Sequence, residues 1–172
     1  MSQGDAAEIS APEHLNAAHD LSVFDSGFPA LDDWLKRRAL ANEEHGASRT
    51  YVVSADGKVV GYYALATGAI TLRVATGRTR RNMPDPIPVM IIGRFAIDKA
   101  YQAKGLGRAL LRDAILRTVQ AAGIGGIRAI LVHAISAEAK RFYERYGFTP
   151  SPLDPMTLMI TVGDAVKALS GR

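Results

Sequence analysis

The chain has 172 residues, 48% hydrophobic and 22% charged, with a net charge of +4, as expected of one soluble globular domain. The absence of cysteine excludes disulfides, cysteine nucleophiles and cysteine-ligated zinc, and the four histidines lack ligand spacing, so no metal site is expected. No apolar run reaches the roughly 18 residues of a membrane span and no signal peptide begins the chain, so we expect a cytoplasmic protein.

The first segments predict a tail, a short strand and a helix. Residues 1–13 are polar and acidic, and we expect a disordered tail before a single domain over residues 14–165. Leu21 to Phe24 is short and apolar and predicts a first strand. Pro29 suits a first helical turn, apolar residues follow at spacings of three and four, and Gly46 predicts the end of that helix.

A β-hairpin is predicted next. The β-branched and aromatic runs at 49–54 and 58–67 flank Asp56-Gly57, a dipeptide typical of two-residue hairpin turns. Residues 68–86 form a looser, arginine-rich stretch that ends in the turn Pro84-Asp85-Pro86.

The second half predicts three strands and two helices. The strands are predicted at 88–98, 127–133 and 156–162. A long amphipathic helix starts near Leu106 and is expected to end at Gly123. Ser136 is the predicted N-cap of a second helix that runs through Tyr146, with Gly147 in the left-handed conformation after it.

A glycine-containing turn, Gln102-Ala103-Lys104-Gly105-Leu106-Gly107, joins the strand at 88–98 to the long helix. The first helical amides lack intrahelical acceptors and the helix dipole favours negative charge, so this turn predicts an anion site. Gly105 and Gly107 allow a phosphate to approach the backbone, and Lys104 and Arg108 add positive charge. The dinucleotide and P-loop glycine patterns are absent. A helix start with two glycines and no ligand is the alternative.

The net charge is unevenly distributed. Residues 1–59 hold ten acidic and five basic side chains, whereas residues 60–131 hold three acidic and eleven basic ones. The basic segment indicates an anionic partner, either a phosphorylated cofactor or a nucleic acid; a solvated basic surface is the alternative.

Two motifs resemble the GNAT superfamily of N-acetyltransferases. The Gln-x-x-Gly-x-Gly of the turn resembles the acetyl-CoA motif Arg/Gln-x-x-Gly-x-Gly/Ala, and Phe142-Tyr143 with Gly147-Phe148 resembles the second signature of the family. Together they cover residues 88–148. The resemblance implies an α/β fold with a central mixed, mostly antiparallel twisted sheet of six to seven strands flanked by helices, whose central strands splay to form an acetyl-CoA cleft.

The resemblance also implies which residues hold acetyl-CoA, with no metal. The main chain of Phe95, Ala96 and Ile97 is expected to hold the pantetheine arm like an added strand. The turn is expected to cradle the pyrophosphate, and Ser136 is a further contact. The residues of the turn in this set are Gln102, Ala103, Lys104, Gly105, Leu106, Gly107 and Arg108.

The resemblance assigns catalysis to Tyr143, whose hydroxyl would protonate the leaving thiolate. Phe142 and Tyr146 share its helical stripe and are expected to be the core pair. No general base is obvious, because His133 lies on an apolar strand and is interpreted as a core histidine. An α-amino group, with a pKa near ~7.7–8.0, does not require one.

Further segments resemble the GNAT toxins of bacterial type II toxin–antitoxin systems over about residues 19–162. They include Leu31-Asp32-Asp33-Trp34-Leu35, Gly46-Ala47-Ser48-Arg49-Thr50 and Val60-Gly61-Tyr62-Tyr63-Ala64. The resemblance implies acetylation of the α-amino group of aminoacyl-tRNA, which blocks translation. It also implies a homodimer and a ribbon-helix-helix antitoxin, through which the toxin reaches operator DNA.

A transfer RNA substrate requires basic side chains beside the cleft. The candidates are Lys36, Arg37, Arg38, Arg49, Arg80, Arg81 and Arg94. Arg94, inside a strand, fits pairing with a carboxylate equally well, and Lys36 and Arg37 also fit a solvated helix face. Two other functions remain open: a GNAT enzyme acting on a small amine or a protein N-terminus, and a non-catalytic co-repressor that binds an antitoxin.

Overall fold

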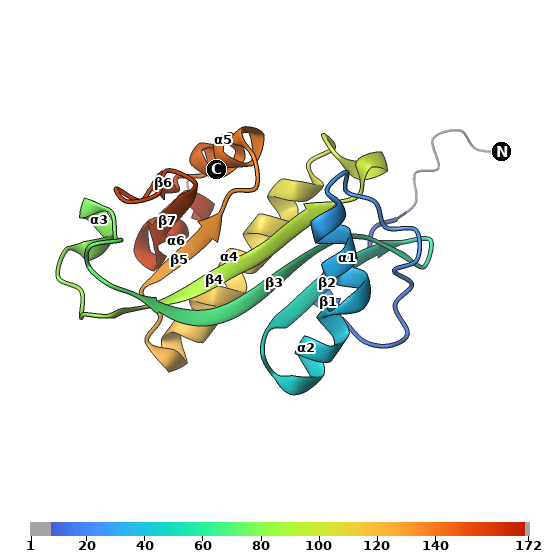
Figure 1. Cartoon of the computed structure of the whole chain (residues 1–172), viewed down its shortest axis with the longest axis horizontal. Helices are drawn as coiled ribbons and strands as arrows, with labels where there is room; N and C mark the ends of the chain where they lie inside the picture. The colour runs from blue at the N-terminus through green and yellow to red at the C-terminus, as the bar shows by residue number, and fades with distance from the viewer. Residues whose placement is uncertain (1–7, 171–172) are drawn as a thin grey trace. The chain divides into compact units, whose positions relative to one another are not determined.

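A computed structural model describes residues 8–170 of the chain (Figure 1). In chain order the elements are β1 (Glu13–His14), α1 (Pro29–Arg37), α2 (Ala39–His45), β2 (Arg49–Ala55), β3 (Lys58–Ile70), α3 (Gly77–Arg80), β4 (Ile87–Ile97), the 3₁₀ turn η1 (Lys99–Tyr101), α4 (Leu106–Gly125), β5 (Ala129–His133), α5 (Ala137–Arg145), β6 (Thr149–Pro150), β7 (Thr157–Thr161) and α6 (Val162–Ser170). No helix within residues 8–170 is both long and apolar enough to cross a membrane.

The strands form one seven-stranded sheet in the order β1-β2-β3-β4-β5-β7-β6. β4 and β5 are parallel, whereas β1 with β2, β5 with β7, and β6 with β7 are antiparallel. This mixed, mostly antiparallel sheet with helices between its strands confirms the predicted α/β fold class. The described chain forms two compact units, residues up to 64 with 94–111, and residues 65–93 with 112 onward, with boundaries inside β3, β4 and α4.

In the first unit, the predicted N-terminal helix is divided into two helices. α1 begins with Pro29, and the carboxylate of Asp32 in its first turn accepts hydrogen bonds from the amide and the hydroxyl of Ser26, at 3.1 and 2.7 Å. Arg38, with φ −122°, separates the helices, and α2 ends at Gly46, whose φ of 74° is left-handed. The predicted start and end are confirmed. The break was missed because one residue outside helical geometry leaves the apolar spacing intact.

The first unit contains the predicted hairpin of β2 and β3. Both turn residues are left-handed, Asp56 with φ 51° and Gly57 with φ 78°, as a type I′ turn requires. One buried core cluster of this unit consists of Leu15, Phe24, Leu35, Ala39, Val52, Val59, Tyr62 and Ala96. This core fixes α1 and α2 on the strands that precede the glycine turn.

The predicted strand at Leu21–Phe24 is wrong. The carboxylate of Asp20 accepts hydrogen bonds from the amide and the hydroxyl of Ser22, at 3.0 and 2.6 Å, and the amide of Phe24 bonds to the carbonyl of Leu21 at 3.2 Å. These local bonds make the segment a turn, because they satisfy backbone groups that a strand would pair with a neighbour.

The first strand is instead β1, which pairs with β2 at the end of the segment expected to be a disordered tail. Residues 1–7 of that segment lie outside the described residues. Ser10 was expected to lie in the disordered tail, but it is bonded to β2. Its amide donates to the carbonyl of Ser54 at 2.8 Å, and its hydroxyl accepts from the amide of Ser54 at 2.9 Å.

In the second unit, β5 lies between β4 and β7 and is almost fully buried. Val89 to Ile92 pair with Ala129 to Val132, and β5 pairs with β7 on its other side. Burial on both faces explains the continuous apolar run of this strand. A core cluster of Ala75, Ile87, Val89, Ala129, Leu131 and Met159 holds these strands together.

Two ends of elements differ from the prediction. α4 continues to Gly125, beyond the expected end at Gly123, because the left-handed residue is Gly126, with φ 73°. β7 stops at Thr161, whose hydroxyl accepts the amide of Asp164 at 3.0 Å and begins the unpredicted helix α6.

Candidate active site

The glycine turn presents backbone amides at the start of α4. Ala103 and Gly105 are left-handed, with φ 61° and 84°, and this reverses the chain between η1 and the helix. The first helical bond runs from the amide of Ala109 to the carbonyl of Gly105 at 3.2 Å. The amides of residues 106–108 therefore have no acceptor within the helix. They are available to an anion such as a pyrophosphate.

The side chain of Gln102 holds this turn in place through two hydrogen bonds. Its Nε2 amide donates to the carbonyl oxygens of Ile97 and Ser26, at 2.8 and 2.9 Å. The first bond ties the turn to the end of β4, and the second ties it to the loop before α1. Both N–H groups of the Gln102 side chain are therefore used within the protein to hold the turn.

Asp98 also holds the turn in place, and this role was not predicted from the sequence. The carboxylate of Asp98 accepts hydrogen bonds from the amides of Ala100, at 2.9 Å, and Asp25, at 3.0 Å. The amide of Lys99 also donates to the carbonyl of Asp25 at 2.8 Å, so both residues fix the same loop. An aspartate directly after a strand and before a turn is a capping signal that would have identified Asp98.

Positive charge surrounds the turn, as expected. The ammonium group of Lys104 lies 5.8 Å from the ring centre of Tyr101, and Arg108 is exposed in the first turn of α4. The α4 amides and these two cations all favour a negatively charged group.

The other expected cofactor residues lie on β4 and before α5. Ala96 is buried in the core of the first unit, whereas Phe95 and Ile97 are half-buried. Ser136 is confirmed as a helix cap, because its hydroxyl oxygen accepts the amide of Ala139 at 3.0 Å. That bond uses the oxygen as an acceptor and leaves the hydroxyl proton for another partner.

Tyr143 is the buried residue of the aromatic stripe on α5, with 5% of its surface exposed. Its ring lies 5.6 Å from the ring of Phe148, which returns over the helix after the left-handed Gly147. Burial raises the pKa of the Tyr143 hydroxyl well above its ordinary value, so this group holds its proton. A buried hydroxyl that stays protonated fits the role of a proton donor.

The prediction that Phe142 and Tyr146 are the core pair is wrong. Both are only half-buried, and their rings contact each other at 5.2 Å, edge to face. Helical spacing places all three aromatic residues on one stripe, but the ring of Phe148 packs against that of Tyr143, the one that is buried.

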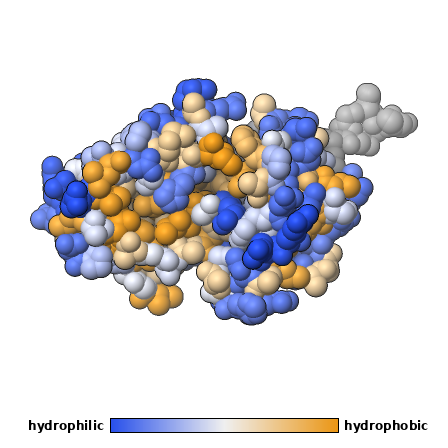
Figure 2. Space-filling view, viewed as in Figure 1, coloured by the Kyte–Doolittle hydropathy of each residue, from blue (hydrophilic) through white to orange (hydrophobic). Residues whose placement is uncertain are grey.

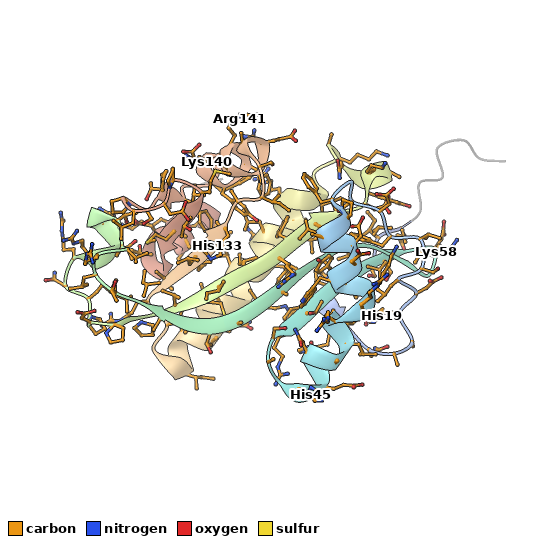
Figure 3. The ribbon with its side chains drawn as sticks, viewed as in Figure 1. His19, His45, Lys58, His133, Lys140 and Arg141 are labelled. Atoms are coloured by element: carbon orange, nitrogen blue, oxygen red, sulfur yellow. The ribbon has the colours of Figure 1, made fainter. Side chains whose placement is uncertain are left out.

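His133 is exposed at the end of β5, so its interpretation as a core histidine is also wrong (Figure 3). Its Nδ1 lies 3.0 Å from the hydroxyl oxygen of Thr157, and that hydroxyl donates to the carboxylate of Asp154 at 2.8 Å. Thr157 therefore accepts from His133, which places a proton on Nδ1.

The predicted RNA contacts in the first unit fall into three groups. Lys36, Arg37 and Arg38 are exposed, and Figure 2 shows strongly hydrophilic side chains over α1 and α2. Arg49 is bound by Glu43 at 3.1 Å. The guanidinium of Arg94 lies 4.3 Å from the ring centre of Trp34, a cation–π contact in place of the carboxylate pairing that was the alternative for this residue.

Arg80 and Arg81 lie in the second unit and are exposed, Arg80 at the end of α3 and Arg81 directly after it.

No cluster of potential metal ligands is present within residues 8–170.

Comparison with known proteins identifies the family. Residues 46–150 match the family described as Acetyltransferase (GNAT) domain. The chain is 53% identical over 162 residues to a tRNA-acetylating toxin of Mycobacterium tuberculosis (strain H37Rv), across 94% of this chain and 97% of that protein.

Solved structures agree with this assignment. AtaT complexed with acetyl-methionyl-tRNAfMet has a TM-score of 0.86 and 25% identity, over 95% of this chain and 99% of that one. AtaTR bound with AcCoA has a TM-score of 0.80 and 26% identity, over 94% of this chain and 98% of that one. With a family match over more than half of its length and a relative of this identity, the chain belongs to the GNAT acetyltransferase family.

Proposed function

We propose that this protein is the toxin of a type II toxin–antitoxin system and transfers the acetyl group of acetyl-CoA to the α-amino group of aminoacyl-tRNA. The observation that carries the proposal is its 53% identity, over 94% of the chain, to a tRNA-acetylating toxin. The similarity to AtaT complexed with acetyl-methionyl-tRNAfMet and to AtaTR bound with AcCoA supports it.

The donor side of the reaction rests on backbone groups. The amides of residues 103–108 hold the pyrophosphate, with Lys104 and Arg108 beside it. The main chain of Phe95 to Ile97 binds the pantetheine arm, and Ser136 donates its free hydroxyl proton to the cofactor. The bonds from Gln102 support this role, because they fix the turn to the end of β4 before any ligand binds.

The chemical step needs one proton donor. The neutral α-amine attacks the thioester carbon, the carbon–sulfur bond then breaks, and the proton that the nitrogen loses restores the one that Tyr143 gives up. Tyr143 gives its proton to the departing sulfur, and its raised pKa supports this role because the hydroxyl is still protonated when the sulfur leaves. The product is an acetylated aminoacyl-tRNA, which has no free amine for peptide-bond formation.

The acceptor is a polyanion, and exposed cations supply its phosphate contacts. Lys36, Arg37, Arg38, Arg80 and Arg81 are all exposed. Arg94 lies over the ring of Trp34, whereas Arg49 is already paired with Glu43.

The partners follow from the same assignment. We propose a homodimer that is neutralised by a ribbon-helix-helix antitoxin and reaches operator DNA only through it. The reaction takes place in the cytoplasm, where aminoacyl-tRNA is present.

The test uses purified protein, labelled acetyl-CoA and total charged tRNA. We expect label on the aminoacyl moiety, released with the amino acid when the ester is cleaved. Label on polyamines or peptides but not on tRNA would replace the proposal with a small-amine acetyltransferase. No transfer to any amine, combined with antitoxin-dependent repression, would identify a co-repressor.

A further inference from the structure

The second unit contains an open pocket of about 460 Å³ that none of the acetyl-CoA residues lines. Its walls come from α3 and the segment after it, from the residues before β5, and from the junction of β7 with α6. Three arginines line it, Arg78, Arg81 and Arg128, and we call it the arginine pocket. Figure 2 shows strongly hydrophilic side chains over α3, at the left of the view.

One of the three arginines serves as a structural clamp. The Nε and Nη2 groups of Arg78 donate to the two carboxylate oxygens of Asp164, both at 2.8 Å. This bidentate pair ties α3 to the first turn of α6. The charge of Arg78 is therefore balanced, and the clamp fixes two walls of the pocket.

The other two arginines carry uncompensated charge. Arg81 and Arg128 are exposed, and neither has an acidic partner within residues 8–170. The amide of Arg128 donates to the carbonyl of Pro88 at 2.9 Å, which fixes its backbone beside the start of β4. Asn82 also lines the pocket. The pocket is thus positively charged, and its charge is free for a ligand.

Apolar groups form the remainder of the lining. Ile127 is 8% exposed, and Met83 and Val162 are half-buried beside it. The volume of about 460 Å³ exceeds what one phosphate needs and lies within the range of small-ligand sites, roughly 300–1,000 Å³. Two guanidinium groups together with apolar lining residues match a nucleotide, which has a phosphate at one end and a base with apolar ring faces at the other.

We propose that the arginine pocket binds a phosphate-bearing nucleotide of the transfer RNA substrate. Arg81 and Arg128 bind the phosphate, and Met83, Ile127 and Val162 contact the ribose or base. The proposal rests on the function proposed above, and it adds Arg128, which charge patterning alone did not single out. RNA is favoured over an acidic peptide because apolar residues line the pocket together with the cations and the surrounding segment, residues 60–131, carries eleven basic and three acidic residues.

Binding of uncharged total tRNA, followed by fluorescence anisotropy over a range of salt concentrations, tests the proposal without any acetyl transfer. Loss of one phosphate contact lowers the slope of log affinity against log salt by about 0.7–0.9. We expect Arg81→Ala and Arg128→Ala each to show this decrease, with affinity about three- to tenfold weaker. Arg128→Lys, which retains the charge, should recover most of the slope.

Lys58→Ala is the matched control, because Lys58 is an exposed cation at the hairpin turn (Figure 3) that does not line the arginine pocket and is no RNA candidate. Slopes for Arg81→Ala and Arg128→Ala equal to that of Lys58→Ala would overturn the pocket proposal and leave the proposed function intact. No tRNA binding by the unmodified protein would instead refute the proposed function. Unchanged tRNA binding with lost antitoxin binding would make the pocket a protein-docking site and would also overturn the proposal.

Discussion

The side-chain amide of Gln102 donates to the carbonyl oxygen of Ser26 across 2.9 Å, so a residue of the cofactor motif supports the loop before α1. Ser26 is 4% exposed, and its carbonyl depends on this donor. The alternation of glutamine and arginine at this motif position has a physical reason, because both side chains can donate to two carbonyls.

Substitution at Gln102 should therefore follow donor capacity. Gln102→Ala should lower the free energy of unfolding by about 1–3 kcal/mol, since two hydrogen bonds are lost. Gln102→Glu should lower the free energy of unfolding further, because its carboxylate would face two carbonyl oxygens. Gln102→Arg should retain acetyl-CoA affinity. Calorimetric titration with acetyl-CoA and denaturant unfolding measure both effects; equal affinity for the Glu and Arg variants would contradict this account.

Gly105→Ala should weaken acetyl-CoA binding through backbone strain. A Cβ at this position meets no atom within 4 Å, so the destabilisation comes from the backbone conformation, with φ 84°. An alanine in this left-handed conformation costs about 1–2 kcal/mol. If the turn shifts to relieve this strain, acetyl-CoA affinity falls roughly tenfold. Gly123→Ala is the control, because it lies inside α4 with open space around it. That variant should be more stable by about 0.5–1 kcal/mol, with unchanged acetyl-CoA affinity.

Tyr143→Phe should lower kcat by about 10²–10⁴ and leave KM nearly unchanged, because the ring still packs on Phe148 while the proton donor is lost. Tyr146→Phe removes a hydroxyl from the half-buried residue that caps the same helix and should have little effect. Steady-state acetylation of charged tRNA separates the two variants, and equal rates would remove Tyr143 from the mechanism.

The pH dependence of the rate should lack an alkaline limb from Tyr143. Its pKa is raised, so the protonated, active form persists as pH rises through ~10, the ordinary tyrosine value. The rate should rise between about pH 6 and 9 as the substrate amine loses its proton. Single-turnover rates across this range provide the measurement. A decline below pH 10 that disappears in Tyr143→Phe would show that the hydroxyl loses its proton earlier.

The clamp between Arg78 and Asp164 should contribute stability only where the carboxylate is ionised. The hydrogen bonds from Arg78 lower the pKa of Asp164 in the folded protein. The contribution of this ion pair to stability is therefore complete above the pKa of Asp164 in the unfolded chain, near ~3.9. It is lost as the pH falls through the lower pKa of the folded protein. Arg78→Ala should lower Tm at pH 7, with a difference from the unmodified protein that shrinks in acid. A difference independent of pH would assign the effect to packing.

The motif-bearing half of the chain was the most predictable from sequence. The turn at 102–107, the cap at Ser136 and the left-handed Gly147 depend on local chemistry, and the structure confirms each of them. Local chemistry also explains the hairpin at Asp56-Gly57, because few residues accept positive φ there.

Features that depend on tertiary contacts were less predictable. Periodicity placed three aromatic residues on one stripe of α5, but the return of Phe148 decides that Tyr143 is buried. Strand composition suggested a buried His133, but the strand ends there and Thr157 binds the ring. The arginine pocket joins Arg78, Arg128 and Gly163, residues too far apart in sequence for charge counting to connect.

Both outer strands of the sheet, β1 and β6, are only two residues long, and β6 contains Pro150. Short edges with a proline offer few unpaired amides, so two subunits gain little by joining their sheets edge to edge. A dimer of this protein should therefore assemble through side-chain surfaces. An interface of that kind can be weakened by single substitutions, whereas a shared backbone ladder could not.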